Sequence, residues 1–291
     1  MPTPKELLDD ALDNLAGALS FRENTTPTSH TLVLVAGLET AEVSEALARY
    51  AVGVLAGWVQ HDATIAEHFV LQGVDGREEL RRLVARIADP GDRAGDELER
   101  WRQTWRDPWI AEVLVHALLV ITRTNPTSIV AGPVYAILAP HPVPKRHGLD
   151  ALAIYGEGAA GDAVAVMVVG ETKASEHDGS AQLTIACDSF DDVELGLSGP
   201  DLRDALKVLA PVLPPVLAAR MPEELWRNHR CYVAAIVHET AFDGTNTRPR
   251  LGQLTPPLAR KRLALIRTTA FQDFFERVTA AMPGAIEEIV G

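Results

Sequence analysis

The chain has 291 residues, 47% hydrophobic and 23% charged, so it can bury one large core or two smaller ones. Its two cysteines, Cys187 and Cys231, form no CxxC pair, which argues against a disulfide framework and a thiolate zinc site. The formal net charge of −13 argues against a nucleic-acid partner, because phosphate binding depends on Lys and Arg. No apolar run approaches the roughly 20 residues of a membrane span, and no signal-peptide pattern opens the chain. We therefore expect a cytoplasmic protein that does not enter a membrane.

The first 107 residues are expected to form a mainly helical region. Apolar residues recur at helical spacing over 5–19 and 40–59, and charged amphipathic helices are predicted over 77–89 and 97–106. A short strand is expected at 31–35. These elements would pack on the remainder of the chain.

The pattern changes at Trp109, where residues 109–121 are apolar nearly all round and predict a buried helix. Four strand candidates follow, with helical stretches at 182–190 and 201–220 before the last strand. The strands are expected at 132–138, 149–155, 164–171 and 231–238. We predict an α/β core over 108–245 in the order helix, three strands, helix, strand. A basic loop and a tail, mostly helical over 257–289, would complete the chain over 246–291.

The second and third of these strands predict a hairpin with charged groups at its mouth. Asp150 opens one strand, and Glu171 and Lys173 close the next on a single face, because side chains alternate along a strand. If Asp150 lies opposite Glu171, then Tyr155 lies opposite Val166 and the glycine-rich segment 156–165 forms the connection. The hairpin would bring two carboxylates and an ammonium together. The alternative is three solvated charges at the rim of a sheet.

Two other motifs have simpler interpretations. Gly156, Gly158 and Gly161 fit a dinucleotide-binding fingerprint, but that fingerprint must open a helix and the residues that follow are β-rich, so we predict a hairpin loop. His238 and Glu239 close the last predicted strand, and a capping or loop role is expected for them because no second histidine of suitable spacing follows.

The sequences GLDALAIY at 148–155 and GETK at 170–173 resemble the PD-(D/E)xK nuclease superfamily. Leu149 stands where that superfamily has proline. More narrowly, the two motifs resemble the nuclease subunit of Hachiman antiphage defence systems, HamA, most closely over 109–240. The resemblance implies a restriction-endonuclease-like mixed sheet, a DNA substrate and a helicase partner.

The same residues suggest a metal-dependent mechanism. Asp150 and Glu171 would hold Mg²⁺ or Mn²⁺, with the Thr172 carbonyl as a further oxygen ligand, because hard divalent cations prefer oxygen donors. Lys173 would orient the attacking water and stabilise charge on the phosphate. The resemblance also implies an acid on the preceding helix, a position that Glu112 matches as a ligand or an orienting group. The alternative is that Glu112 pairs with His116 in the core.

Basic residues gather in two acid-free stretches, 244–272 and 113–149. We expect nucleic-acid contacts from both, although a solvated helix face would give the same pattern. The candidate residues are Lys145, Arg146, Arg248, Arg250, Arg260, Lys261 and Arg262.

The predicted function is a metal-dependent DNA nuclease, which the resemblance places in antiphage defence. One alternative is a binding or regulatory subunit that has the nuclease-like fold without turnover, which the acidic balance favours. A second is a metal-dependent hydrolase of small phosphoesters, which would also suit an acidic surface.

Overall fold

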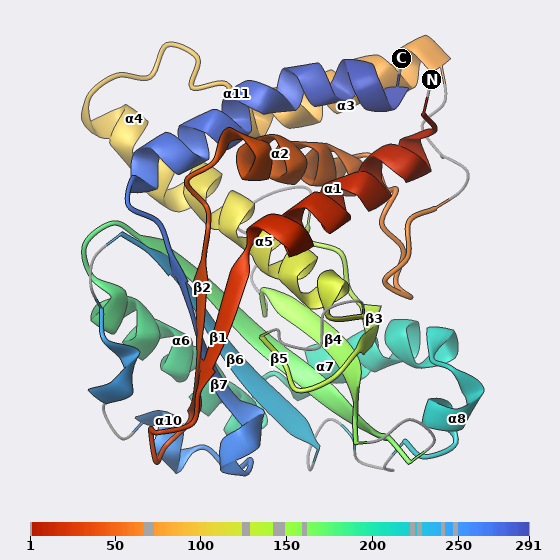
Figure 1. The fold of residues 1–291 in the computed structure, drawn as a ribbon, viewed down its shortest axis with the longest axis vertical. Helices are drawn as coiled ribbons and strands as arrows, with labels where there is room; N and C mark the ends of the chain where they lie inside the picture. The colour runs from red at the N-terminus through yellow and green to blue at the C-terminus, as the bar shows by residue number, and fades with distance from the viewer. Residues whose placement is uncertain are drawn as a thin grey trace.

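The computed structural model of the protein has a seven-stranded mixed sheet at its centre, with helices on both faces of the sheet (Figure 1). The strand order is β1-β2-β7-β6-β5-β4-β3. The four strands β2, β7, β6 and β5 run parallel, and β1, β4 and β3 pair antiparallel with their neighbours. The model describes residues 2–66, 73–123, 129–141, 149–158, 162–221, 225, 229–239, 242–246 and 250–290. The strands are β1 Ser20–Asn24, β2 Thr31–Ala36, β3 Val134–Ile137, β4 Ala151–Glu157, β5 Val164–Ser175, β6 Arg230–His238 and β7 Lys261–Arg267.

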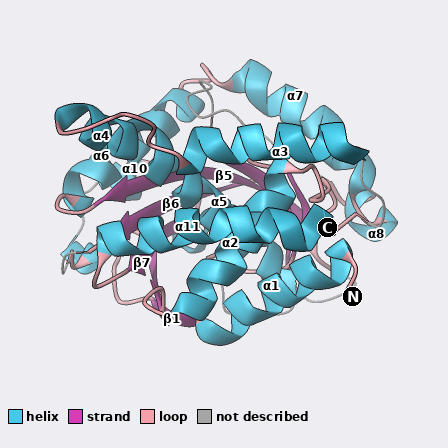
Figure 2. Cartoon of the chain, turned by 90° about the horizontal axis from the view of Figure 1, so that it is seen from above, coloured by secondary structure: helices cyan, strands magenta, loops and turns pink. Residues whose placement is uncertain are grey.

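One face of the sheet carries a layer of long helices. These are α1 Pro4–Ala18, α2 Ala41–Leu55, α3 Gly73–Ala88, α5 Asp107–Val120 and α11 Phe271–Val290, with the short α4 Asp96–Trp101 beside them. Seen from above, α3, α11, α2 and α1 lie side by side over the strands (Figure 2). Helix α5 lies between the other helices and the sheet, and its apolar residues on all sides explain its near-complete burial.

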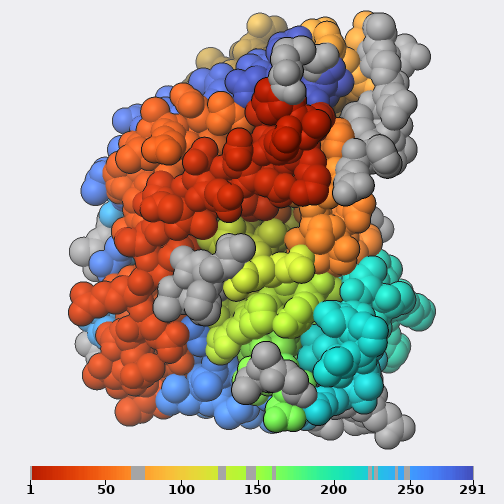
Figure 3. Space-filling view, turned by 45° about the vertical axis from the view of Figure 1, so that its right-hand side comes forward, coloured from red at the N-terminus to blue at the C-terminus, as the bar shows by residue number. Residues whose placement is uncertain are grey.

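The other face is covered by α6 Gly179–Glu194, α7 Gly199–Leu209, α8 Pro215–Ala218 and α10 Arg250–Gln253. Alternate residues of β5 point to the two layers, so Met167 and Val169 contact the α6 side and Val166 and Val168 the α5 side. The segment around β3 and β4 reaches the surface between α1 and the α7–α8 segment (Figure 3).

Local sequence fixes where several helices begin. Thr3 caps α1 in a reciprocal capping box with Glu6, whose side chain accepts a hydrogen bond from the Thr3 backbone. The Asp178 side chain accepts a hydrogen bond from the Ala181 amide at 2.8 Å, which starts α6 three residues after β5 ends. Glu239 accepts a hydrogen bond from the Phe271 amide at the start of α11, as its predicted capping role requires.

The central elements follow the predicted order, which is α5, β3, β4, β5, α6 with α7, and then β6. The predicted hairpin register is confirmed, since Ala151 pairs with Gly170 and Tyr155 with Val166. The antiparallel β4–β5 ladder confirms the hairpin, but the connection is shorter than the predicted 156–165, because Gly156 pairs with Ala165 and Glu157 with Val164; residues 159–161 lie outside the described residues. Strand β5 runs four residues beyond its predicted end at 171, because it continues to pair with β6 as far as Ser175.

The sequence did not predict two of the strands, β7 and β1. The helical tail expected over 257–289 is wrong for residues 261–267, which form β7 between β2 and β6. Burial on both faces explains this strand, whose residues 263–266 form a continuous apolar run. Strand β1 is a polar edge strand with little apolar signal. Through β2 and β7, the N-terminal and C-terminal regions join the same sheet as residues 108–245.

The described ranges contain no helix that could cross a membrane. None of the helices in these ranges combines the length and the apolar character that crossing a bilayer requires.

Candidate functional site

The candidate site lies where β5 extends past the start of β4. Asp150 directly precedes β4, and the ladder pair Ala151–Gly170 places it beside Glu171. Glu171 and Lys173, two residues apart, project from one face of β5 towards α6, as the strand period predicts. The structure therefore brings together the three charged side chains that the hairpin predicted.

Hydrogen bonds hold these groups in place. The Lys173 ammonium donates to Glu171 Oε2 at 2.7 Å and to Asp150 Oδ2 at 3.4 Å. The Thr172 amide donates to Asp150 Oδ2 at 2.8 Å. The Glu171 side chain is only 4% exposed, against 18% for Asp150 and 21% for Lys173. The ammonium thus neutralises two carboxylates that would otherwise repel each other.

Glu112 reaches the same site from helix α5. It lines one cavity with Asp150 and Lys173, and its charge interacts with theirs. His116, one turn further along, bonds the Tyr50 hydroxyl through Nδ1 at 2.8 Å inside the core. The alternative of a self-sufficient Glu112–His116 pair is therefore wrong.

Burial strongly perturbs the carboxyl groups. The pKa of Glu112 is raised to about 8, first by burial and then by the charge of Asp150. Burial and Asp150 together raise the pKa of Glu171 to about 7. Burial alone would lower the pKa of Lys173, but Asp150 and Glu171 raise it above its ordinary value. Perturbed carboxyls beside a charged ammonium are typical of functional sites.

Glu112, Asp150 and Lys173 line a cavity of about 560 Å³, and Glu171 lies behind Lys173 outside its lining. The segment from Glu99 of α4 to Glu112 of α5 and the first turn of α11 form one wall, and the segment from β5 to α6 forms the other. Asp107, Gln272, His177 and Asp178 line it as well, and sequence reasoning did not place them. Gln272 could not be placed because β7 was read as helix, whereas the position of Asp178 directly after β5 was a usable signal.

The donor atoms suit a hard divalent cation. Thr172 donates its amide towards Asp150, and the N–H and C=O of a strand residue point to the same side, so its carbonyl also faces the region beyond the start of β4. The buried Thr172 hydroxyl has no hydrogen-bond partner in the described part of the chain. Two carboxylates and a carbonyl are the oxygen ligands that Mg²⁺ and Mn²⁺ prefer.

The carboxylates are not gathered into a complete coordination sphere in this arrangement. Among the residues that the structure describes, no three acidic, histidine or cysteine side chains lie close enough together to hold a metal ion. Lys173 bonds both Asp150 and Glu171, so its ammonium takes the place that a cation would share. Metal binding would therefore require Lys173 to move away from at least one carboxylate.

The four candidate nucleic-acid residues that the structure describes do not form the expected basic surface. Lys261 and Arg262 are buried in β7, where Arg262 bonds the Ile129 carbonyl and Glu23, each at 2.8 Å. Arg260 forms an ion pair with Glu157. Arg250 pairs with Asp188 at 2.5 Å and with Asp191 at 2.6 Å. Lys145, Arg146 and Arg248 lie outside the described residues.

Comparisons with known proteins add no assignment. Neither the protein-family models nor the curated proteins contain a match to this chain. The functional argument therefore depends on the site itself.

Proposed function

We propose that the protein is a metal-dependent nuclease that hydrolyses phosphodiester bonds at the site of Asp150, Glu171 and Lys173. The observation that carries the proposal is the convergence of two carboxylates and an ammonium within hydrogen-bond distance at the mouth of one hairpin. Glu112 of α5 lines the same cavity as Asp150 and Lys173. Burying charges is costly, so a set of partly buried charged groups beside a cavity supports a functional role.

The roles of the side chains follow from their chemistry. Asp150 and Glu171 would hold Mg²⁺ or Mn²⁺ with the Thr172 carbonyl, and the bound cation would lower the pKa of water and neutralise the phosphate. Lys173 would donate to a phosphate oxygen and stabilise the charge that develops there. Glu112 would either ligate the cation or orient the attacking water. Hydrolysis forms a bond from the water oxygen to phosphorus and breaks the bond to the leaving oxygen.

The arrangement of elements supports the finer resemblance to the PD-(D/E)xK superfamily. Helix α5, the meander β3-β4-β5, the crossover through α6 and α7, and the parallel strand β6 follow the order that the resemblance implies. The acidic and Glu-x-Lys motifs occupy the second and third strands of that unit. A restriction-endonuclease-like core, a DNA substrate and a helicase partner in antiphage defence are all part of this proposal.

The test is cleavage of supercoiled, linear and single-stranded DNA by the purified protein with Mg²⁺, Mn²⁺ or EDTA. Asp150→Asn and Glu171→Gln are expected to lose both Mn²⁺ binding and cleavage. Lys173→Gln is expected to bind Mn²⁺ at least as tightly as wild type, because a competing ammonium is gone, yet to lose cleavage.

The matched controls are Asp204→Asn and Lys207→Gln, an exposed ion pair on α7 whose side chains are 72% and 76% exposed. They should cleave like wild type. Glu112→Gln separates its two roles, since weaker Mn²⁺ binding indicates a ligand and unchanged binding an orienting group. Metal-dependent cleavage by an Asp150→Asn, Glu171→Gln double variant would refute the proposal.

A second candidate, a hydrolase of small phosphodiesters, is favoured by the charge of the cavity. Six carboxyl side chains line it against one ammonium, that of Lys173. A polyanion would be repelled there more strongly than a molecule with a single phosphate. Rapid metal-dependent hydrolysis of bis(p-nitrophenyl) phosphate with no DNA cleavage would select this candidate. If neither substrate is cleaved although Mn²⁺ binds, the regulatory subunit without turnover is the better assignment.

A further inference from the structure

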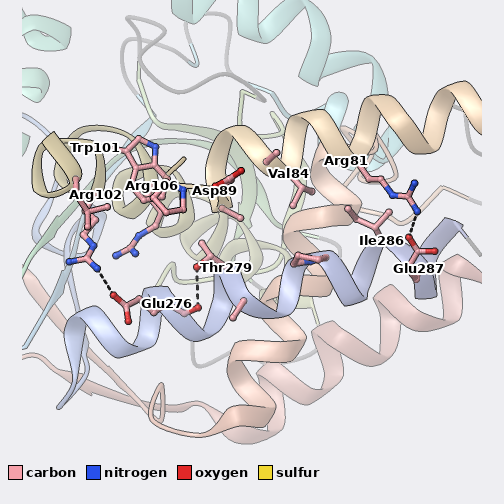
Figure 4. Close-up of a pocket in the computed structure, with 16 residues that line it drawn as sticks. Arg81, Val84, Asp89, Trp101, Arg102, Arg106, Glu276, Thr279, Ile286 and Glu287 are labelled. Carbon is pink, nitrogen blue, oxygen red and sulfur yellow. Dashed lines mark hydrogen bonds and ion pairs between the residues drawn. The ribbon is translucent and has the colours of Figure 1, made fainter. Parts of the chain in front are cut away.

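A second cavity, of about 820 Å³, lies outside the candidate site, between helices α3 and α11 (Figure 4). Trp101 of α4 closes one end. Protein interiors are normally close-packed, and this space exists because small residues face it from both helices. Ala85 and Ala88 on α3 and Ala280 on α11 are the clearest examples. We refer to this cavity as the α3–α11 groove.

Most of the charged side chains along the groove form ion pairs. Arg102 bonds Glu276 at 2.6 Å near the Trp101 end, and Arg81 bonds Glu287 at 2.6 Å near the other end (Figure 4). The buried Arg106 guanidinium bonds Asp107, also at 2.6 Å. A further acid on the lining, Asp89, is exposed to solvent. An anionic ligand would have to break one of these pairs, and a cationic ligand would be drawn to the solvent-exposed Asp89, whereas an uncharged ligand needs no ionic partner.

The floor of the groove offers one hydrogen-bond acceptor. Pro283 lies inside α11 and has no N–H, so the Thr279 carbonyl loses the partner that an α-helix normally supplies four residues later. Thr279 and Pro283 both line the groove. A carbonyl that lacks its usual helical partner, beside apolar surface, favours a ligand that brings a donor.

The size of the groove matches a small molecule. Ligand cavities are commonly about 300–1,000 Å³ and mainly apolar, with few polar groups that fix orientation. The distance along α11 from Glu276 to Glu287 is about 16 Å at the helical rise of about 1.5 Å per residue. The space is therefore long and narrow.

We propose that the α3–α11 groove binds an uncharged, elongated apolar molecule with one hydrogen-bond donor, of the class of long-chain alcohols. Its chain would lie on Val84, Ile286 and the alanines, and its hydroxyl would donate to the Thr279 carbonyl. The proposal is independent of the metal-dependent activity.

The test uses Nile red, an uncharged apolar dye, with the full-length protein and equilibrium fluorescence. Saturable binding is expected, and 1-decanol should displace the dye at a concentration at least about tenfold below that of decanoate or decyltrimethylammonium, because decanoate would disturb a matched pair and the ammonium would be held by the solvent-exposed Asp89. Decyl methyl ether lacks the donor and should compete about fivefold less well than 1-decanol. Equal or better displacement by either ion would overturn the assignment of an uncharged ligand.

Two variants locate the site. Ala280→Phe places a ring in the groove from an exposed position and should weaken dye binding at least about tenfold, whereas Ala41→Phe, exposed at the start of α2, should not. Pro283→Ala returns an N–H to the Thr279 carbonyl, so it should keep dye binding but lose the preference for the alcohol over the ether. Dye binding unaffected by Ala280→Phe, in a variant with wild-type circular dichroism, would overturn the groove as the site. An intact alcohol preference in Pro283→Ala would overturn the hydrogen bond.

Discussion

Burial determines the ionisation of the carboxyl groups at the candidate site. Glu171 is almost fully enclosed, and Glu112 sits in the most apolar helix of the chain. Both pKa values are raised, because each group loses solvation and lies near the charge of Asp150. Lys173 compensates part of that cost through its two hydrogen bonds. In the proposed metal site, protonation and cation binding would therefore compete for the same oxygen atoms.

The raised pKa of Glu112 predicts how stability depends on pH in the metal-free protein. The folded state keeps a proton on Glu112 up to about pH 8, while the unfolded state releases it near the ordinary glutamate pKa of 4.5. The folded state therefore binds more protons between these values, and its contribution to stability is lost as the pH rises through that window. We expect the unfolding free energy in EDTA to fall less between pH 5 and pH 8 in Glu112→Gln than in wild type, by urea denaturation.

The exposed Glu78→Gln in α3 is the control and should reproduce the wild-type slope. Parallel pH curves for wild type and Glu112→Gln would show that Glu112 ionises normally.

At the scale of elements, the start of α5 depends on a buried ion pair. Arg106 ends the π-helical segment Arg102–Arg106, and Asp107 begins α5; both side chains are 3% exposed. Arg106 also donates to Gln272 of α11 at 2.9 Å. The pair therefore ties together two helices that line the candidate site, and α5 carries Glu112.

Removing one partner of this pair should be costly. Asp107→Leu would leave the Arg106 guanidinium buried and uncompensated, so we expect a loss of about 3–5 kcal/mol in unfolding free energy. The double variant Arg106→Met, Asp107→Leu removes both charges and should recover most of that loss. Urea denaturation of both single variants and the double variant measures the coupling. A double variant no more stable than Asp107→Leu would contradict the charge argument.

At the scale of the whole molecule, the sheet joins distant parts of the sequence. Strand β7, from the C-terminal region, pairs with β2 on one side and β6 on the other. Residues of α2 and α11 belong to the same hydrophobic core as residues of β5 and β6. In the full chain, strands and helices from outside residues 108–245 therefore bury part of the surface of the predicted core.

This arrangement predicts that residues 108–245 do not fold alone. Without β7, the buried strand β6 would become an edge with unpaired backbone groups. We expect the isolated segment to aggregate or to lack cooperative thermal unfolding, measured by circular dichroism, while residues 1–291 unfold cooperatively. A soluble, cooperatively folded segment 108–245 would show instead that the core is an independent domain.

The pairing of basic side chains predicts weak binding to DNA. Arg250 and Arg260 are engaged by acids, Lys261 and Arg262 are buried, and the net charge is −13. We expect the isolated chain to bind duplex DNA weakly, with an affinity that falls with salt at a slope reporting only a few phosphates. Fluorescence anisotropy from low to physiological salt measures this slope. Tight binding that is insensitive to salt would contradict it. Reversing Arg260, Lys261 and Arg262 to Glu is expected to unfold β7, so it cannot report on DNA contacts.

The sequence by itself determined the hairpin and its charged mouth. Local periodicity fixed the shared face of Glu171 and Lys173, and the spacing between the two strands fixed the register that puts Asp150 beside them. The buried character of α5 was equally visible, because a helix that is apolar all round has no solvent face. These features depend on residues within one element or in two neighbouring strands.

Only the tertiary structure decided the features that depend on distant neighbours. Residues 261–267 form a strand because β2 and β6 supply hydrogen-bond partners on both sides, and this burial turned expected surface charges into internal ones. His116 forms its hydrogen bond with Tyr50, which is 66 residues away along the chain, and not with the nearby Glu112. The α3–α11 groove exists because small residues of two helices far apart in sequence face each other. Periodicity reports the face that a segment buries, but the partner that covers this face is set by packing across the whole chain.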